Sequence, residues 1–157
     1  AEQVRILTQA RKHSKSIQTL NATVVLIEDN TVVRDSLTAL LKTWGLRVSA
    51  HSELSPDLFE SIALMPQVDV ILSDYNLGSN KANGLETILE INRRRKEKIP
   101  AILLTAVGDD KIQIDYRHIL SSLPEDEVKY FALPKILQKP ISGEDLNEAI
   151  STVLSKH

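Results

Sequence analysis

Four apolar runs of this sequence end in side chains that can bind a cation or a phosphate. Glu28 and Asp29 follow the first run, Asp74 follows the third, Thr105 the fourth and Lys139 the fifth. If the first and third runs are neighbouring strands, three carboxylates converge, and such a cluster needs either protonation or a compensating cation. Oxygen ligands favour a hard ion such as Mg²⁺, which takes one or two carboxylates together with water and phosphate oxygens. The pattern therefore predicts a magnesium site that handles phosphate.

The same residue types suit the transfer of a phosphoryl group to a side chain. The carboxylate of Asp74 can attack phosphorus in line and form an aspartyl phosphate. Lys139 and the metal would neutralise the transferred oxygens, and the hydroxyl of Thr105 would bind one of them. Each residue alone also has a structural interpretation: Asp29 as a helix cap, Asp74 as a turn residue, Thr105 as a strand former and Lys139 as a solvated loop cation. Their coincidence at four strand ends favours the chemical interpretation.

The apolar runs that must position these side chains alternate with segments of helical period. They lie at residues 23–27, 46–50, 68–72, 101–104 and about 135–138. The first and third are almost continuously apolar, as strands buried on both faces are. This alternation is typical of an α/β doubly wound fold, in which helices cover both faces of a parallel sheet. Because ligands in such folds bind at the carboxyl ends of the strands, the candidate residues would share one edge of the sheet.

Helical periodicity predicts five helices, at about residues 33–44, 56–63, 85–92, 111–120 and 146–154. Asn30, Ser55 and Ser142 are good N-caps, and Gly45 supplies a C-terminal stop. The basic run at 93–96 stands where a helix dipole favours cations, and we expect it to be a solvated helix end.

The composition favours one globular domain. The chain has 157 residues, of which 42% are hydrophobic and 25% charged, enough for one core. A net charge of −2 offers no positive field for nucleic acid or an anionic membrane. The absence of cysteine excludes disulfides, thiolate zinc sites and a thiol nucleophile, and it fits a cytoplasmic location. We expect neither a secretion signal nor a membrane span.

The charge is distributed unevenly along the chain. Residues 1–20 hold four basic residues and one acidic residue. We therefore predict that residues 1–20 form a basic linker or helix extension and that residues 21–157 form the folded domain.

Four motifs stand in order at the predicted strand ends. They are Val-Leu-Ile-Glu-Asp-Asn at 25–30, Ile-Leu-Ser-Asp-Tyr-Asn-Leu at 71–77, Leu-Leu-Thr-Ala at 103–106 and Leu-Gln-Lys-Pro-Ile at 137–141. Through them, the stretch from about residue 23 to 154 resembles the receiver domain of two-component response regulators. The resemblance implies a flavodoxin-like, five-stranded parallel sheet with strand order 2-1-3-4-5.

The resemblance also implies roles for individual residues. Asp74 would accept a phosphoryl group from a histidine kinase or a histidine phosphotransfer domain. Glu28, Asp29, Asp74 and the backbone carbonyl of Asn76 would hold Mg²⁺, with Asp29 binding directly and Glu28 assisting through water.

By the same resemblance, Thr105 and Lys139 would bind the phosphoryl oxygens. Thr105 would move towards them, and the Lys139–Pro140 peptide bond would be cis. The sequence also departs from the family. Ile136 stands where an aromatic switch residue is usual, residues 78–81 lengthen one loop, and residues 107–134 form a long connection that contains an acidic turn.

The leading functional hypothesis is a magnesium-dependent phosphoacceptor and switch with a downstream effector, and with no direct nucleic acid or membrane contact. The basic N-terminal segment, Asp-Tyr-Asn-Leu and Lys-Pro-Ile-Ser favour the receiver of a hybrid sensor kinase over that of a DNA-binding regulator. A receiver can also catalyse its own phosphorylation from small phosphodonors and its own dephosphorylation, so an enzyme label depends on definition.

Two other classes compete with this hypothesis. A degenerate receiver that acts only as a docking module is favoured by Ile136 and the long loops, and opposed by the retained Asp74. An aspartate-dependent phosphatase needs a second Asp where this chain has Asn76, and a nucleotide-binding enzyme needs a Gly-rich phosphate loop that is missing here.

Overall fold

The computed structural model describes residues 17–53, 55–78 and 81–155. In this part of the chain, five parallel strands form one sheet in the order β2-β1-β3-β4-β5, which confirms the predicted fold. The strands are β1 (Thr23–Ile27), β2 (Arg47–His51), β3 (Val70–Asp74), β4 (Ala101–Thr105) and β5 (Lys135–Gln138). The connections reverse direction between β1 and β3, so the carboxyl ends of these two strands flank a crevice.

Two strands begin and end later than the sequence predicts. The third strand starts at Val70 rather than 68, because the carboxylate of Asp69 accepts a hydrogen bond from the backbone N–H of Thr23 at 2.7 Å. It continues to Asp74, which pairs in register with Leu104 of β4. The second strand begins and ends one residue later than predicted, because its pairing with β1 sets its limits from Arg47 to His51.

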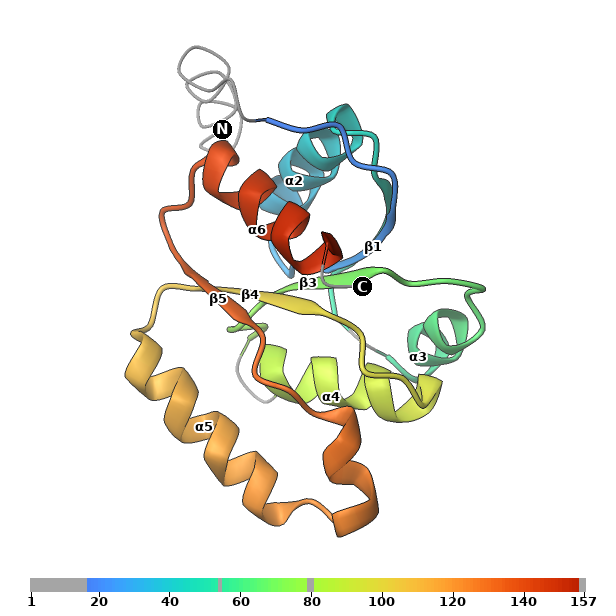
Figure 1. Cartoon of the computed structure of the whole chain (residues 1–157), viewed down its shortest axis with the longest axis vertical. Coiled ribbons are helices and arrows are strands. Elements are labelled where there is room, and N and C mark those ends of the chain that lie inside the picture. Colours follow the sequence, from blue (N-terminus) through green and yellow to red (C-terminus); the bar gives the residue numbers. More distant parts are fainter. Residues whose placement is uncertain (1–16, 54, 79–80, 156–157) are drawn as a thin grey trace.

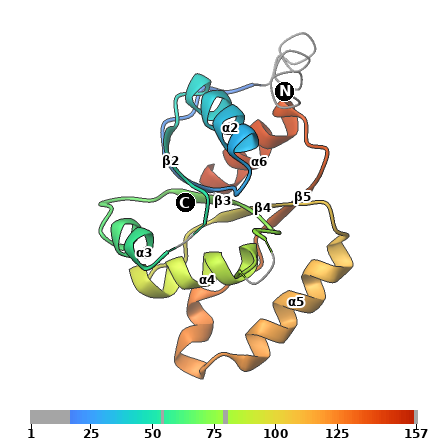
Figure 2. The same cartoon turned by 180° about the vertical axis from the view of Figure 1, so that it is seen from behind.

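Helices cover both faces of the sheet (Figures 1 and 2). One face carries α2 (Thr31–Thr43) and α6 (Gly143–Ser155), and the other carries α3 (Pro56–Ala63), α4 (Gly84–Arg95) and α5 (Asp109–Ser122). Each layer encloses its own apolar cluster against the sheet. The central strands β3 and β4 are buried along their whole length, as their continuous apolar sequence predicts.

The predicted caps are confirmed. The side chains of Asn30, Ser55 and Ser142 each accept a hydrogen bond from the backbone N–H three residues later, at 3.0, 3.3 and 3.0 Å. Gly45 has a φ of 91°, and a Cβ there would lie 2.4 Å from the backbone oxygen of Leu20. Glycine is therefore required where α2 turns into β2.

The sequence indicated a solvated end for α4, but part of this basic end is buried. The side chain of Arg95 is 4% exposed and donates to the backbone oxygens of Ile62 and Met65, at 2.8 Å each. Its guanidinium thus binds two carbonyls at the end of α3, and the carbonyl of Ile62 also accepts from the N–H of Met65 at 3.2 Å. Arg93 pairs with Glu127 at 2.9 Å, so one of the acidic residues expected in a solvated turn is also engaged.

The long connection between β4 and β5 contains two helical elements. The helix predicted at 111–120 extends over Asp109–Ser122, and the predicted acidic turn opens a 3₁₀ helix, η1 (Glu125–Tyr130). The rings of Tyr116 and Phe131 pack with centroids 4.9 Å apart. The side chain of Asn92 donates to the backbone oxygen of Tyr130 at 3.0 Å, which fixes η1 against α4.

The predicted basic segment, residues 1–20, lies mostly outside the described residues. Its last part packs against the fold. The side chain of Asn147 on α6 both accepts from and donates to the backbone of Gln18, at 3.0 Å each, and Leu20 is buried. Within the described ranges, every helix is too short or too polar to cross a membrane.

Candidate functional site

Three carboxylates meet where β1 and β3 end. One oxygen from each of Glu28, Asp29 and Asp74 lies within 4.8 Å of the others. Glu28 and Asp74 are 3% and 7% exposed, whereas Asp29 is open to solvent. Asn30, rather than Asp29, caps α2, so the structural interpretation of Asp29 as a helix cap is wrong.

Burial and neighbouring charge raise the pKa of Glu28 from 4.5 to about 8. Loss of hydration is the largest cause, and the adjacent Asp74 adds both charge repulsion and a hydrogen bond. The ammonium of Lys139 lowers the pKa by a smaller amount. The three carboxyl groups of the cluster are thus too close together and too buried to carry full negative charge without compensation.

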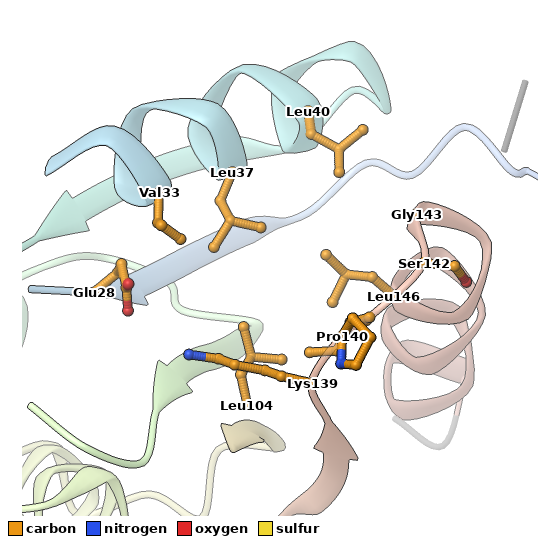
Figure 3. A pocket seen from close by; sticks show the side chains of 11 residues that line it. Glu28, Val33, Leu37, Leu40, Leu104, Lys139, Pro140, Ser142, Gly143 and Leu146 are labelled. Atoms are coloured by element: carbon orange, nitrogen blue, oxygen red, sulfur yellow. The ribbon is translucent and has the colours of Figure 1, made fainter. Parts of the chain in front are cut away.

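An apolar cavity of about 390 Å³ lies beside Glu28, between α2 and the start of α6 (Figure 3). Glu28 and Lys139 stand at one end, and Leu37 and Leu146 line the interior. These aliphatic neighbours limit the hydration of Glu28, which is the physical source of its raised pKa.

Lys139 reaches the site from the end of β5. Its Nζ lies 2.9 Å from Oδ1 of Asp74, and its backbone N–H donates to the oxygen of Thr105 at 2.8 Å. The Lys139–Pro140 bond is cis, as the resemblance implied. Thr105 is buried at the end of β4, where its Oγ1 accepts a hydrogen bond from the N–H of Val107 at 2.9 Å.

All six predicted site residues line one hollow of about 520 Å³. They are Glu28, Asp29, Asp74, Asn76, Thr105 and Lys139. The side chain of Asn76 turns towards its own loop and accepts from the N–H of Gly78 at 3.1 Å, which leaves its backbone carbonyl as the oxygen that the sequence analysis assigned to a metal.

The donor set fits a hard divalent cation. It consists of the oxygens of three carboxylates, of which Glu28 and Asp74 are buried, and among the described residues the cluster has an ion pair with Lys139. The pKa of Glu28 rises to about 8 despite this ammonium, so one lysine does not compensate the charge of three carboxylates. Mg²⁺ prefers such oxygen ligands and keeps sites for water and phosphate, so the residues present suit it.

Three contacts at the site were missed by the sequence analysis. Arg34 donates to the backbone oxygen of Glu28 at 2.8 Å and fixes the first strand end. Gly84 lies against the end of β3, where a Cβ would stand 2.4 Å from the backbone oxygen of Asp74. The hydroxyl of Tyr75 donates to Asp115 on α5. The sequence signals for the last two contacts were weak. Gly84 is one glycine at the start of a helix, and Tyr75 and Asp115 are forty positions apart.

Comparisons with known proteins agree with this geometry. The family model of the response regulator receiver domain matches residues 24–119. A search of curated proteins finds no match.

Solved structures share the fold. A receiver domain protein from Clostridium thermocellum is 21% identical with a TM-score of 0.66, over 86% of this chain and 95% of its own. A CheY-like receiver from Methanospirillum hungatei is 18% identical with a TM-score of 0.66, over 87% and 96%. The receiver of a sensor histidine kinase from Pseudomonas aeruginosa is 21% identical with a TM-score of 0.62, over 87% and 99%, and has magnesium coordinated in its active-site cleft.

Proposed function

The chain belongs to the response regulator receiver domain family of two-component signalling, and on this premise we propose that it accepts a phosphoryl group on Asp74. The observation that supports this most is the meeting of three carboxylates and the Lys139 ammonium at the carboxyl ends of β1, β3 and β5. A carboxylate nucleophile, a cation pocket and a charge-neutralising ammonium are the parts that in-line phosphoryl transfer needs.

The donor is a phosphohistidine of a histidine kinase or a phosphotransfer domain. A carboxylate oxygen of Asp74 forms a bond to phosphorus while the P–N bond breaks, and the electron pair of that bond leaves with the imidazole. Lys139 already lies 2.9 Å from Asp74 and neutralises charge on the transferred oxygens. Thr105 presents its hydroxyl to one of them from the end of β4.

Glu28, Asp29, Asp74 and the backbone carbonyl of Asn76 would hold Mg²⁺. When bound, the ion supplies positive charge to the phosphoryl oxygens. Glu28 must lose its proton for that binding, because a carboxyl with a pKa of about 8 is largely protonated at neutral pH.

The proposal also covers the location of the domain and the kind of protein to which it belongs. We place the domain in the cytoplasm, where histidine kinases act, and assign it to a hybrid sensor kinase rather than to a DNA-binding regulator. The Asp-Tyr-Asn-Leu and Lys-Pro-Ile-Ser sequences and the basic segment at residues 1–20 support that assignment.

The test is incubation with acetyl phosphate and Mg²⁺, followed by intact mass spectrometry. We expect one phosphoryl adduct, which disappears in Asp74→Asn and in a sample treated with a chelator. Asp109→Asn is the matched control, because this exposed aspartate lies at the start of α5 rather than in the carboxylate cluster, and its adduct should equal that of the wild type.

Two results would contradict the proposal. One is the absence of an adduct under conditions that label a known receiver. The other is an adduct that persists in Asp74→Asn. The first result, together with no Mg²⁺ binding in calorimetry, would favour a docking module without phosphorylation.

A further inference from the structure

Tyr75 joins the phosphoacceptor strand to α5. It follows Asp74 directly, and its backbone is fixed on both sides: its N–H donates to Leu104 at 2.8 Å, and its carbonyl accepts from the N–H of Gly84 at 2.7 Å. The side chain is 9% exposed, and its hydroxyl donates to the carboxylate of Asp115. Since the backbone of Tyr75 cannot move independently of the sheet, this hydrogen bond ties the middle of α5 to the strand that carries Asp74.

Helix α5 packs on the α4 side of the sheet through one buried residue, Ile112, and three half-buried ones, Tyr116, Ile119 and Leu120. Of its fourteen residues, all of them described, Ile112 is the one that is buried. Its N-cap is Gly108, which provides no side-chain hydrogen bond, and Ile114 is 58% exposed. Figure 1 shows α5 running away from the sheet towards η1. An element with one fully buried side chain is held less tightly than the buried sheet, so a hydrogen bond to a charged acceptor contributes to its position.

The start of α5 is connected to the site by a second path. The N–H of Val107 donates to Oγ1 of Thr105 at 2.9 Å, and Gln138 at the end of β5 donates to the carbonyl of Val107 at 3.2 Å. A phosphoryl group on Asp74 would attract the hydroxyl of Thr105, and a displaced Thr105 would move the loop that leads into α5. The helix is therefore in contact with the site both at its start and, through Asp115, at its middle.

Ile136 cannot provide this hold. It lies half-buried on β5 among the apolar side chains of the α4 and α5 layer, and it has no hydrogen-bonding group. Tyr75 is the aromatic residue that reaches from the site to α5.

We propose that Tyr75 and Asp115 are positioning residues whose hydrogen bond holds α5 in its unphosphorylated position, and that phosphorylation of Asp74 releases it. This inference rests on the proposed function. The bond favours one of two arrangements of α5, so its removal shifts the population towards the other. Because such coupling is reciprocal, loss of the bond also raises the affinity of the protein for a bound phosphoryl mimic, on the order of tenfold.

The experiment places a fluorine label on α5. The chain has no cysteine, so Ile114→Cys gives a single site for a trifluoromethyl reagent on an exposed position. Fluorine spectra are recorded for the labelled protein with Mg²⁺, before and after addition of beryllofluoride as a phosphoryl mimic. Tyr75→Phe and Asp115→Asn are compared with the parent, since both keep the size of the side chain.

Two controls separate the bond from its surroundings. Tyr116→Phe removes a hydroxyl from α5 itself but keeps the ring that packs on Phe131. Lys111→Gln removes the weaker ion pair that Asp115 makes at 3.5 Å. Both controls should leave the starting spectrum and the affinity for beryllofluoride unchanged.

We expect Tyr75→Phe and Asp115→Asn, without beryllofluoride, to shift the fluorine signal towards that of the parent with beryllofluoride, and to bind beryllofluoride more tightly in titrations. Combining them should add nothing, because they break one bond. If the parent gains a phosphoryl adduct and responds to beryllofluoride while both variants retain its starting spectrum, the positioning role of Tyr75 and Asp115 is overturned. If the parent itself gains no adduct, the proposed function fails and this inference with it.

Discussion

The first prediction concerns how the unfolding free energy depends on pH in wild type and in Glu28→Gln, both freed of Mg²⁺ by a chelator. Glu28 is 3% exposed, and its pKa rises from 4.5 to about 8 on folding. The folded protein therefore holds a proton that the unfolded chain has lost. The stabilisation is fully present below about pH 4.5 and declines as the pH rises, until it is lost above about pH 8.

Each pH unit in that window corresponds to about 1.4 kcal/mol. Between pH 6 and pH 8 the wild type should lose roughly 2–3 kcal/mol of unfolding free energy that the neutral amide of the variant does not lose. The measurement is urea unfolding followed by the fluorescence of Trp44, the chain's single tryptophan, which is buried on the opposite side of the sheet from α4.

His51 provides the main competing effect and has the opposite sign. Burial, assisted by Arg34, lowers its pKa, so its contribution grows as the pH rises towards the ordinary histidine value and is then constant. His51 is present in both proteins and cancels in their difference. A wild type and variant with parallel stability profiles from pH 6 to pH 8 would refute the assignment of the proton to Glu28.

Three further predictions concern single side chains. Gly84→Ala should destabilise the fold by about 1–3 kcal/mol in urea unfolding and slow labelling by acetyl phosphate, because its Cβ would meet the backbone oxygen of Asp74 at 2.4 Å. Gly108→Ala is the control, since a Cβ there has nothing within 4 Å. Lys139→Met should slow acetyl phosphate labelling on the order of 100-fold in timed mass spectra, and an unchanged rate would contradict its role. Arg95→Met should cost about 1–2 kcal/mol of unfolding free energy, since the carbonyls of Ile62 and Met65 each lose a charged donor and only that of Ile62 keeps a backbone N–H; a loss below about 0.5 kcal/mol would count against this.

The sequence predicted the elements that are specified locally. Asn30 and Gly45 delimit α2 because a cap and a left-handed turn depend on residues a few positions away. The strand limits were less certain because pairing sets them. The carboxylate of Asp69 binds the N–H of Thr23, forty-six positions away, and no local pattern encodes that contact.

The candidate site was accessible to prediction for a topological reason. In a parallel sheet every strand ends at the same edge, so polar residues that follow apolar runs converge without any knowledge of their side-chain contacts. Asp29, Asp74 and Lys139 were found in this way. Arg95 was misread because its charge indicated solvent, whereas its partners are carbonyls at the end of another helix. Such partners are set by how α3 packs on α4.

The chemistry and the response of this domain are built from parts of different stability. The residues of the proposed phosphoryl transfer stand at the ends of β1, β3, β4 and β5, in a sheet whose central strands are buried throughout. The connection that must report the transfer contains α5, with Ile112 as its single buried residue. The family model ends at residue 119, within α5, and leaves η1, β5, Lys139 and α6 outside the matched residues as well. A buried sheet next to a helix with one fully buried residue would allow a small displacement of Thr105 to move α5 while the carboxylate cluster keeps its geometry.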